Sequence, residues 1–364
     1  MKNKSKDKKK HTSGGKKGTG FGRKVLWSFV FMLLLGALFS GYELYKTIFA
    51  PNVFLKYEKS SFLYIPSNAK YEDVIQILKE KHFLANIESF DWLASGLDYK
   101  SNVHPGKYKI RSGMSNKDLL VLLKSGRQTA VKLVLNNLRT KEELVSRISK
   151  QVEADSSVFL GLLNSVEYMA KYNLDTQNAL SLVMPNTYEV YWNTSPIKIL
   201  DKIGSAYKKF WGSERLKKSK KLNFTPAQVI VLASIVEKET LKNSEKMNIA
   251  GVYINRLRLG HKLEADPTLV YACGDFAIRR VLNVHREIDS PYNTYMYPGL
   301  PPGPICMPSV SSIDAVLNYE KHDYLYFCAK PDFSGFHQFS RTFEEHLSVA
   351  RQFRKELGRR NIMN

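Results

Sequence analysis

The 364-residue sequence predicts an α+β protein that begins with one transmembrane helix and continues as a small module and a larger mixed α+β domain. Three observations predict this class. An uncharged apolar run lies near the N-terminus, short strand patterns alternate with helical patterns after residue 58, and helix-start signals recur to the end of the chain. Hydrophobic residues make up 43% of the chain, which is enough apolar surface for a folded core.

Residues 25–48 are expected to cross a membrane once. The 18 residues from Val25 to Tyr42 carry no charge, close to the roughly 20 that span a bilayer, and Trp27, Tyr42 and Tyr45 are placed like interfacial anchors. A cleaved signal peptide is the alternative, although the apolar run is longer than a typical signal core and no clear cleavage site follows it. We therefore expect an uncleaved anchor.

Residues 1–24 form a basic tail before this span. They hold ten of the 55 Lys and Arg residues of the chain and a single acid, Asp7. Because positive charge before a span keeps the N-terminus in the cytoplasm, the rest of the chain is expected on the outer side of the inner (cytoplasmic) membrane. The net charge of +21 would otherwise favour a nucleic-acid partner. On that side of the membrane we expect no nucleic acid, and an anionic lipid surface or wall polymer instead.

Residues 58–128 have the pattern of a small α+β module. A strand over 62–65 closes at Pro66 and is followed by a helical pattern. A second strand over 107–110 follows a Pro-Gly turn and precedes a helix that Ser115 caps. Two short strands that flank helices therefore predict a compact unit.

Residues 129–222 are expected to be mostly helical. A strand pattern after residue 131 is followed by a helix whose start is marked by the capping box of Thr140 and Glu143. The lysine run at 217–221 is expected to be a solvated linker or loop. This part therefore connects the module to the C-terminal region.

Residues 223–364 carry the strongest local signals. The pair Thr225-Pro226 marks a helix start by two independent rules, and this helix should run to about residue 241. Later patterns predict a short helix capped by Thr268, strands over 324–329 and 336–339, and a terminal helix opened by Thr342. The region is expected to be a mixed α+β domain.

Helical geometry separates two acids at the end of the first of these helices. Glu239 continues the apolar face made by Leu232, Ile235 and Val236, whereas Glu237 lies about 200° around the axis. A carboxyl at the end of a buried face is partly desolvated, which raises its pKa toward the range of a general acid at neutral pH. The alternative is that Glu239 pairs with a lysine at the helix end, and periodicity alone favours that alternative.

The segment 289–308 is the most unusual in the chain. It contains six prolines, two glycines and three tyrosines in twenty positions, so no helix or strand is expected. Tyrosine faces stack on sugar rings, while Asn and Thr side chains bond to hydroxyl and acetamide groups. This loop is therefore expected to bind a sugar, and a rigid loop with packed tyrosines is the alternative.

Other chemical signals are weak. Asp266 lies in a turn before Thr268, where a structural role is as open as substrate contact. The histidines match no metal-ligand spacing, and neither a nucleophile elbow nor a glycine-rich phosphate loop is present. We expect no metal and no cofactor. Three cysteines are too few and too scattered for a disulfide framework: Cys273, Cys306 and Cys328.

Several ordered stretches of the chain resemble the endolytic murein transglycosylase (MltG/YceG-like) family. They are LASIVEKET (232–240), VYINRLRLG (252–260), ADPTLVY (265–271), SPYNTY (290–295), GLPPGPI (299–305) and YLYF (324–327). The resemblance implies that 58–128 is a LysM-like βααβ module and that 223–364 is the catalytic core. It also implies that the second glutamate of the EKE triplet, Glu239, is the catalytic acid. Asn186 and Ala265 depart from the family pattern.

The reaction implied by the resemblance cleaves the β-1,4 bond between N-acetylmuramic acid and N-acetylglucosamine without water and leaves a 1,6-anhydro end. Glu239 would protonate the leaving oxygen and then take the proton of the C6 hydroxyl that attacks C1. Ordinary glycosidases use two carboxylates, and no convincing second one is evident. The candidates for holding the substrate are Asp266, Thr268, Ser290, Tyr292, Asn293, Thr294 and Tyr295.

The implied partners are peptidoglycan glycan strands, the lipid bilayer and peptidoglycan synthases such as penicillin-binding proteins. Tethering to the membrane would restrict cutting to strands near it, which suits termination of strand elongation. Two alternatives stay open. One is a membrane-anchored, non-catalytic peptidoglycan-binding scaffold, and the other is a true hydrolase that uses Glu239 with Asp266.

Overall fold

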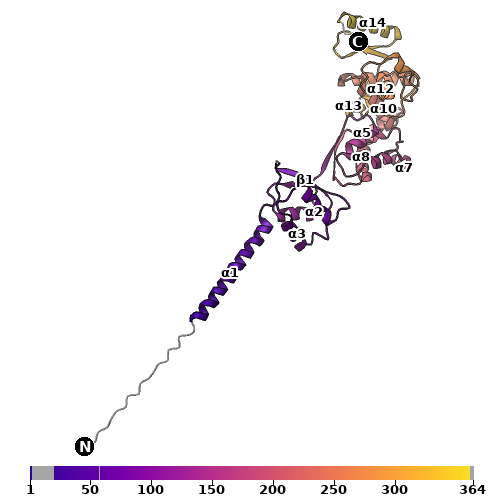
Figure 1. Ribbon diagram of the computed structural model, residues 1–364. Helices are drawn as coiled ribbons and strands as arrows, with labels where there is room; N and C mark the ends of the chain where they lie inside the picture. The colour runs from indigo at the N-terminus through magenta and orange to yellow at the C-terminus, as the bar shows by residue number, and fades with distance from the viewer. Residues whose placement is uncertain (2–19, 57, 361–364) are drawn as a thin grey trace. The chain divides into compact units, whose positions relative to one another are not determined.

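The computed structural model describes residues 1, 20–56 and 58–360, so most of the predicted basic tail lies outside the described residues. Contacts between residues divide the chain into two units, 1–127 and 128–364. Helices and short antiparallel strands alternate through both units (Figure 1), as the element order shows. The predicted mixture of helix and strand is confirmed.

The first unit begins with one long helix, α1 (Gly20–Phe49). Its side chains from Phe21 to Gly41 are exposed, and by length and composition it is long and apolar enough to span a membrane. The predicted span, 25–48, lies within it. The last turn of α1 is fixed to the rest of the unit, because the Asn116 side-chain amide donates a 2.9 Å hydrogen bond to the Thr47 carbonyl.

The remainder of the first unit is a two-stranded sheet with three helices. Its elements are β1 (Ser60–Ile65), α2 (Tyr71–Glu80), α3 (Ile87–Gly96), β2 (Gly106–Arg111) and α4 (Asn116–Lys124). β1 pairs antiparallel with β2, which places Leu63 opposite Tyr108. Both of these side chains are buried, with Phe90 of α3 and Leu119 of α4, in one core. Alternate strand residues thus face the helices, as period-two burial requires.

The second unit begins with a β-pair and a group of helices. The elements are β3 (Val131–Leu135), α5 (Lys141–Ser149), α6 (Ser156–Leu163), α7 (Val166–Ala170), η1 (Ala179–Leu182), β4 (Asn186–Val190), α8 (Pro196–Phe210) and α9 (Ser213–Lys221). β3 and β4 pair antiparallel. The loop expected at 217–221 is wrong, because these lysines form the end of α9. Lysine is a good helix former, and positive charge in a last turn complements the helix dipole.

The second half of this unit is arranged around α10. The elements are α10 (Pro226–Glu239), η2 (Asn243–Glu245), α11 (Lys246–Arg258), α12 (Asp266–Cys273), η3 (Asn283–Glu287), α13 (Val310–Leu317), β5 (Tyr326–Ala329), β6 (His337–Ser340) and α14 (Phe343–Arg359). α10 packs against α11, α12 and α13. Residues 229–236 are all buried, so this helix is the centre of the core.

Helix boundaries follow the sequence signals with two corrections. The capping box of Thr225 and Gln228 is present, but α10 ends at Glu239 because Thr240 adopts an extended conformation. Thr268 does not cap α12: Ala265 is the N-cap residue, and Thr268 lies one turn further on, where its hydroxyl donates 2.7 Å to the Ala265 carbonyl. Pro267 explains the shift, since proline is favoured in a first helical turn.

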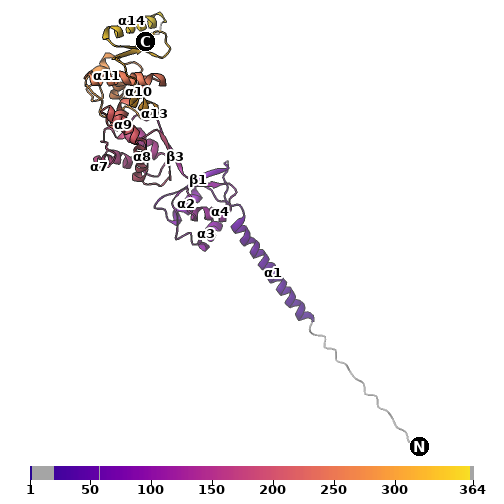
Figure 2. The ribbon, with the colours of Figure 1, turned by 180° about the vertical axis from the view of Figure 1, so that it is seen from behind.

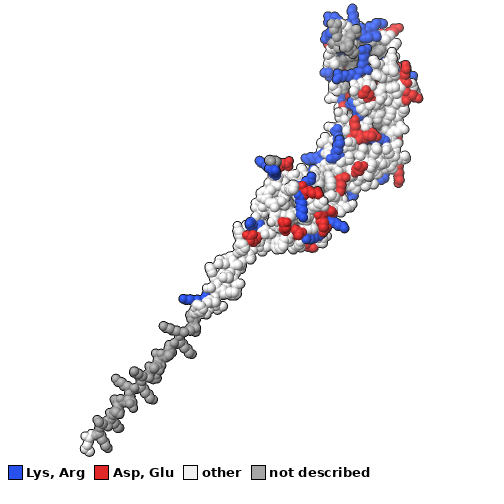
Figure 3. Space-filling view, in the orientation of Figure 1, with Lys and Arg blue, Asp and Glu red and all other residues white. Residues whose placement is uncertain are grey.

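The C-terminal part of the unit is a small subdomain of β5, β6 and α14. The two strands pair antiparallel and α14 packs on them, at the end of the unit away from α5 and α8 (Figures 1 and 2). Lys and Arg gather at this end in Figure 3. The arginines and lysine of α14 are Arg351, Arg354, Lys355 and Arg359, and Arg360 is its C-cap residue.

Candidate active site

Glu239 lies at the last position of the buried helix α10. Leu232, Ile235 and Val236, which share its face, are fully buried, while Glu239 itself is partly exposed. The hydroxyl of Tyr253, on α11, donates a 2.5 Å hydrogen bond to Oε1 of Glu239. Tyr253 is only 2% exposed, so its ring is fixed by the core. The carboxyl is therefore held at one oxygen by a donor that cannot easily move.

The surroundings of Glu239 favour its protonated form. Burial raises the pKa of the Glu239 carboxyl, the hydrogen bond from Tyr253 lowers it, and the negative charge of Asp266 raises it further, with a net pKa of about 7. Such a carboxyl can both give and take a proton near neutral pH. Among the described residues, no ion pair involves Glu239, and Lys242 lies over the ring of Phe336 instead. The lysine pairing considered from the sequence is wrong.

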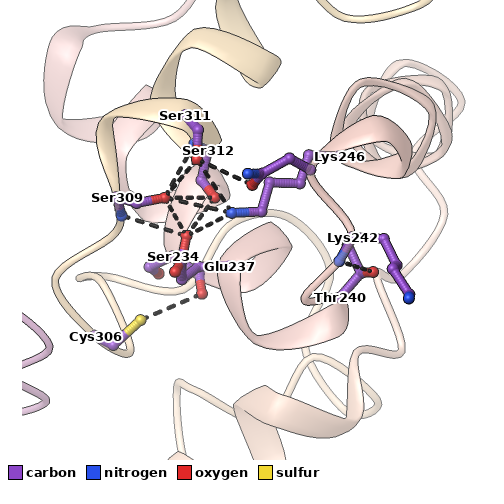
Figure 4. Close-up of polar contacts among 10 residues, drawn as sticks. Ser234, Glu237, Thr240, Lys242, Lys246, Cys306, Ser309, Ser311 and Ser312 are labelled. Carbon is purple, nitrogen blue, oxygen red and sulfur yellow. Dashed lines mark hydrogen bonds and ion pairs between the residues drawn. The ribbon is translucent and has the colours of Figure 1, made fainter. Parts of the chain in front are cut away.

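Glu237 has a different environment from Glu239. Its Oε2 accepts hydrogen bonds from Ser309 Oγ at 2.5 Å, Ser312 Oγ at 2.5 Å and Lys246 Nζ at 3.1 Å (Figure 4). Burial raises the pKa of Glu237, but these hydrogen bonds and the charge of Lys246 outweigh it and lower the pKa below 4.5. Glu237 thus joins α10 to α11 and to the N-terminus of α13. It is a structural carboxylate.

Two cavities meet at Glu239. One has a volume of about 510 Å³ and the other about 490 Å³, and both have Glu239 and Asp266 in their walls. Because the same two carboxylates line both cavities, a long ligand can pass them and occupy space on either side. Concave sites of this size are typical of ligand-binding clefts.

Asp266 is the second carboxylate at this junction. It is the first residue of α12 and is exposed, and it accepts a 2.6 Å hydrogen bond from the hydroxyl of Tyr295. Tyr295 comes from the proline-rich segment 289–308, which contains no helix or strand, as predicted. The junction therefore unites α10, α11, α12 and this loop.

The YceG-like family matches residues 63–352 of the chain. The chain belongs to this family. It is 28% identical over 310 residues to the endolytic murein transglycosylase of Bacillus subtilis strain 168. The matched region covers 79% of this chain and 83% of that protein. The endolytic murein transglycosylase of Streptococcus pneumoniae D39 is 26% identical over 339 residues, or 84% of this chain and 60% of that protein. The chain thus spans about three fifths of the pneumococcal relative's length.

A solved structure has a similar fold. The 2.6 Å crystal structure of a YceG-like protein from Listeria monocytogenes matches with a TM-score of 0.55 and 27% sequence identity. The match covers 80% of this chain and 99% of that chain. The YceG-like fold is therefore shared over most of the residues described.

The seven substrate-binding candidates divide into three groups. Asp266 and Tyr295 line the same cavity as Glu239. Three others, Thr268, Asn293 and Thr294, are at most 2% exposed and bond within the protein. The hydroxyls of Thr268 and Thr294 lie 2.8 Å apart, and Thr294 also accepts from the Ala265 amide, while the Asn293 amide donates to two backbone carbonyls. Their observed contacts are internal, and they shape the loop.

The last two candidates, Ser290 and Tyr292, make contacts that pack the loop. Ser290 Oγ accepts a hydrogen bond from the Tyr292 amide, and the Tyr292 ring packs on Tyr271 with 4.6 Å between ring centroids. A Cβ on Gly303 would lie 2.8 Å from the Tyr292 hydroxyl and 2.3 Å from a backbone oxygen. Only glycine fits there, so Tyr292 and Gly303 fix the loop against the core. Neither Ser290 nor Tyr292 lines the two cavities at Glu239.

The sequence patterns did not reveal several residues of the site. Tyr253 was missed because it lies among other buried residues of α11, so its position in the helical pattern does not distinguish it from a packing residue. Arg279 and Arg280 were missed because they lie in an irregular segment. The available signal for Tyr253 was the family stretch 252–260, which contains both Tyr253 and Arg256.

A metal ion has no evident place in the described part of the chain. Among those residues no group of three or more His, Cys, Asp or Glu side chains is arranged to hold one. The site chemistry available is that of carboxyl, phenol and guanidinium groups. The expectation that the reaction uses no metal or cofactor stays a prediction.

Proposed function

We propose that this chain is an endolytic murein transglycosylase, as its Bacillus and Streptococcus relatives are named. One observation carries the proposal: Glu239, with a pKa of about 7 and no cationic partner in the described residues, lies where two cavities meet. A glycan strand that continues in both directions needs such an open-ended site. This supports cleavage within a strand.

The proposed reaction breaks the β-1,4 bond between N-acetylmuramic acid and N-acetylglucosamine. Protonated Glu239 gives its proton to the oxygen that leaves with N-acetylglucosamine, while the bond to the muramyl C1 breaks. The Glu239 carboxylate then accepts the proton of the muramyl C6 hydroxyl, whose oxygen bonds to C1. The product is a 1,6-anhydro end, and Glu239 is again protonated.

The neighbours of Glu239 fit this double role. Tyr253 occupies Oε1, so Oε2 is the oxygen available for proton transfer. The negative charge of Asp266, which raises the pKa of Glu239, also favours the positive charge that develops on the muramyl ring as its bond breaks. The hydrogen bond from Tyr295 holds Asp266 in place. Asp266 and Tyr295 are therefore our retained substrate-site residues, and Thr268, Ser290, Tyr292, Asn293 and Thr294 support the loop that carries them.

The first unit is proposed to place this chemistry at the membrane. α1 anchors the chain in the inner membrane with its N-terminus in the cytoplasm and the catalytic unit outside. A signal sequence near the N-terminus passes the same test of length and composition and is the alternative. Residues 58–128 form a LysM-like module that adds affinity for glycan strands. Support comes from the β1-α2-α3-β2 order and from the division of the chain at 127, next to the expected boundary.

The proposed setting is the growing cell wall. With 129–222 as the connecting part and 223–364 as the catalytic core, the tethered enzyme cuts nascent strands beside peptidoglycan synthases and so ends their elongation. Tethering limits the reach of the site to strands near the membrane. Synthase partnership is tested by copurification with full-length protein.

The chemistry of the new chain ends tests the function. Full-length protein in detergent is incubated with purified sacculi in water enriched in ¹⁸O, and the products are identified by mass spectrometry. Anhydro-muramyl ends without ¹⁸O are expected. Reducing ends that carry ¹⁸O would indicate a hydrolase using Glu239 with Asp266, and the absence of new ends would indicate a binding scaffold. Either result would overturn the proposal.

A further inference from the structure

One of the two cavities at Glu239 is strongly cationic. Four basic side chains line the cavity of about 510 Å³, against two acids, Glu239 and Asp266. The basic residues come from three parts of the second unit: Arg139 follows β3, Lys238 is in α10, and Arg279 and Arg280 lie between α12 and η3. Residues far apart in the sequence therefore bring like charges to one wall.

These cations outnumber the acids of the cavity and are not paired with them. In the described part of the chain, none of the four forms an ion pair with a carboxylate. The Arg139 guanidinium lies 4.4 Å from the centre of the Phe276 ring, which fixes its position in the wall. Arg279 and Arg280 are exposed. Four basic side chains against two acids leave this wall with an excess of positive charge, which attracts anions.

The other cavity has a different character. Its Arg256 pairs with Glu264, and its Arg286 lies over the ring of Tyr295, 4.6 Å from the ring centre. Aromatic side chains make up much of the remaining wall, among them Tyr326, Phe327 and Phe343. This cavity offers ring faces and paired charges. Uncharged sugar suits it, because sugar rings stack on aromatic faces.

We propose that the cavity lined by Arg139, Lys238, Arg279 and Arg280 binds the carboxylate-bearing peptide of a muramyl residue beside the bond that is cut. The proposal rests on the proposed function. In murein only the muramyl residues carry a peptide, and its free carboxylates are anionic at neutral pH. Arginine forms paired hydrogen bonds to carboxylates, so guanidinium groups suit such a ligand. The charge difference between the cavities then sets which part of the strand lies on each side of Glu239.

A charge-matched pair of substrates tests the proposal. Sacculi are used either untreated or after their free carboxyl groups are converted to amides with carbodiimide and ammonium, which leaves the glycan unchanged. For wild-type enzyme, kcat/KM from the release of anhydro ends is expected to be about tenfold higher on the untreated strands. In R279Q/R280Q this ratio is expected to fall toward one. The control R359Q/R360Q removes two adjacent arginines outside both cavities and should keep the wild-type ratio.

The outcomes separate this proposal from the function it rests on. Anhydro ends released equally from both substrates by wild-type enzyme, or a ratio retained in R279Q/R280Q, would overturn the peptide site alone. If no anhydro ends form, a binding measurement tests the peptide site instead. A soluble muramyl peptide and its amidated form are titrated into full-length E239Q protein. The amidated form is expected to bind more weakly. In E239Q/R279Q/R280Q protein this difference in affinity is expected to disappear. Equal binding, or tighter binding of inorganic phosphate than of the muramyl peptide, would contradict the proposal.

Discussion

The hydroxyl of Tyr253 donates a 2.5 Å hydrogen bond to Oε1 of Glu239, so the acid at the end of α10 is oriented by a buried phenol from α11. The two effects on this carboxyl oppose each other. Burial favours the protonated form, and the hydrogen bond from Tyr253 favours the charged form. A pKa of about 7 is their balance, with the charge of Asp266 added.

Tyr253→Phe should remove the orienting bond while keeping the ring in the core. We expect kcat to fall about tenfold, since a hydrogen bond to an ionised group contributes roughly 1.5–3 kcal/mol. Loss of this donor should also raise the pKa of Glu239 above about 7, so the alkaline limb of the pH-rate profile moves upward. Rates from pH 5 to 9 measure both effects. An unchanged limb with an intact fold would exclude Tyr253 from the proton-transfer step.

Asp266→Asn should move the same limb in the opposite direction. The charge of Asp266 raises the pKa of Glu239, so its removal should lower that pKa and make activity decline at lower pH. Asp289→Asn is the matched control, because Asp289 also accepts a 2.6 Å hydrogen bond from a tyrosine, Tyr297, but lines neither cavity. The control should keep the wild-type profile. A shift of equal size in both variants would point to a general effect of loop charge.

Glu239→Gln should stabilise the protein above neutral pH. A carboxyl whose pKa is raised to about 7 in the folded protein contributes stability that is fully present below pH 4.5, its ordinary pKa. This contribution is lost as the pH rises through 7. Glutamine has no charge to bury and can still accept from Tyr253. We expect a gain on the order of 2 kcal/mol at pH 8 and little gain at pH 5. Thermal unfolding at both pH values tests this, and a loss of stability at pH 8 would contradict the burial of the Glu239 charge.

Glu237→Gln should have the opposite effect on stability. Lys246, with a side chain only 6% exposed, would lose the carboxylate that it pairs with, and we expect a loss of about 2 kcal/mol at pH 7. The pKa of Glu237 is lowered, so its stabilisation is present above pH 4.5 and disappears as the pH falls through the folded pKa. The deficit of the variant should therefore shrink as the pH falls below 4.5. A deficit that does not change with pH would assign the loss to packing alone.

The sequence placed Glu239 on the apolar face of a regular helix, but periodicity alone favoured a lysine pair, and the resemblance to the family implied the role of acid. Three apolar positions at helical spacing defined the buried face of α10, and Glu239 fell on that face while Glu237 did not. Tyr253 of α11 carries no such signal, because it lies among residues 249–254, which are all buried, and its type does not distinguish it from a residue that packs in the core. A tyrosine among them is identified only by the partner that folding brings to it.

The proline-rich loop was predicted correctly as irregular, but the roles of its residues could not be assigned from their types. Asn and Thr bond equally well to a sugar or to the backbone of their own loop. In the structure Asn293 and Thr294 bond to their own loop and its neighbours, and Tyr295 lines the cavity. Burial decides between the two roles, and burial depends on contacts with α12 that are distant in the sequence.

The central claim is that one carboxyl, Glu239, performs both proton transfers, and product analysis of matched variants tests it most directly. Full-length wild-type, Glu239→Gln and Glu237→Gln proteins, each verified as folded at the assay temperature, are incubated with the same sacculi and the anhydro-muramyl ends are counted. We expect Glu239→Gln to release about a thousandfold fewer ends and Glu237→Gln to retain substantial activity. Anhydro ends released by Glu239→Gln at the wild-type rate, with activity lost in folded Glu237→Gln instead, would contradict the assignment.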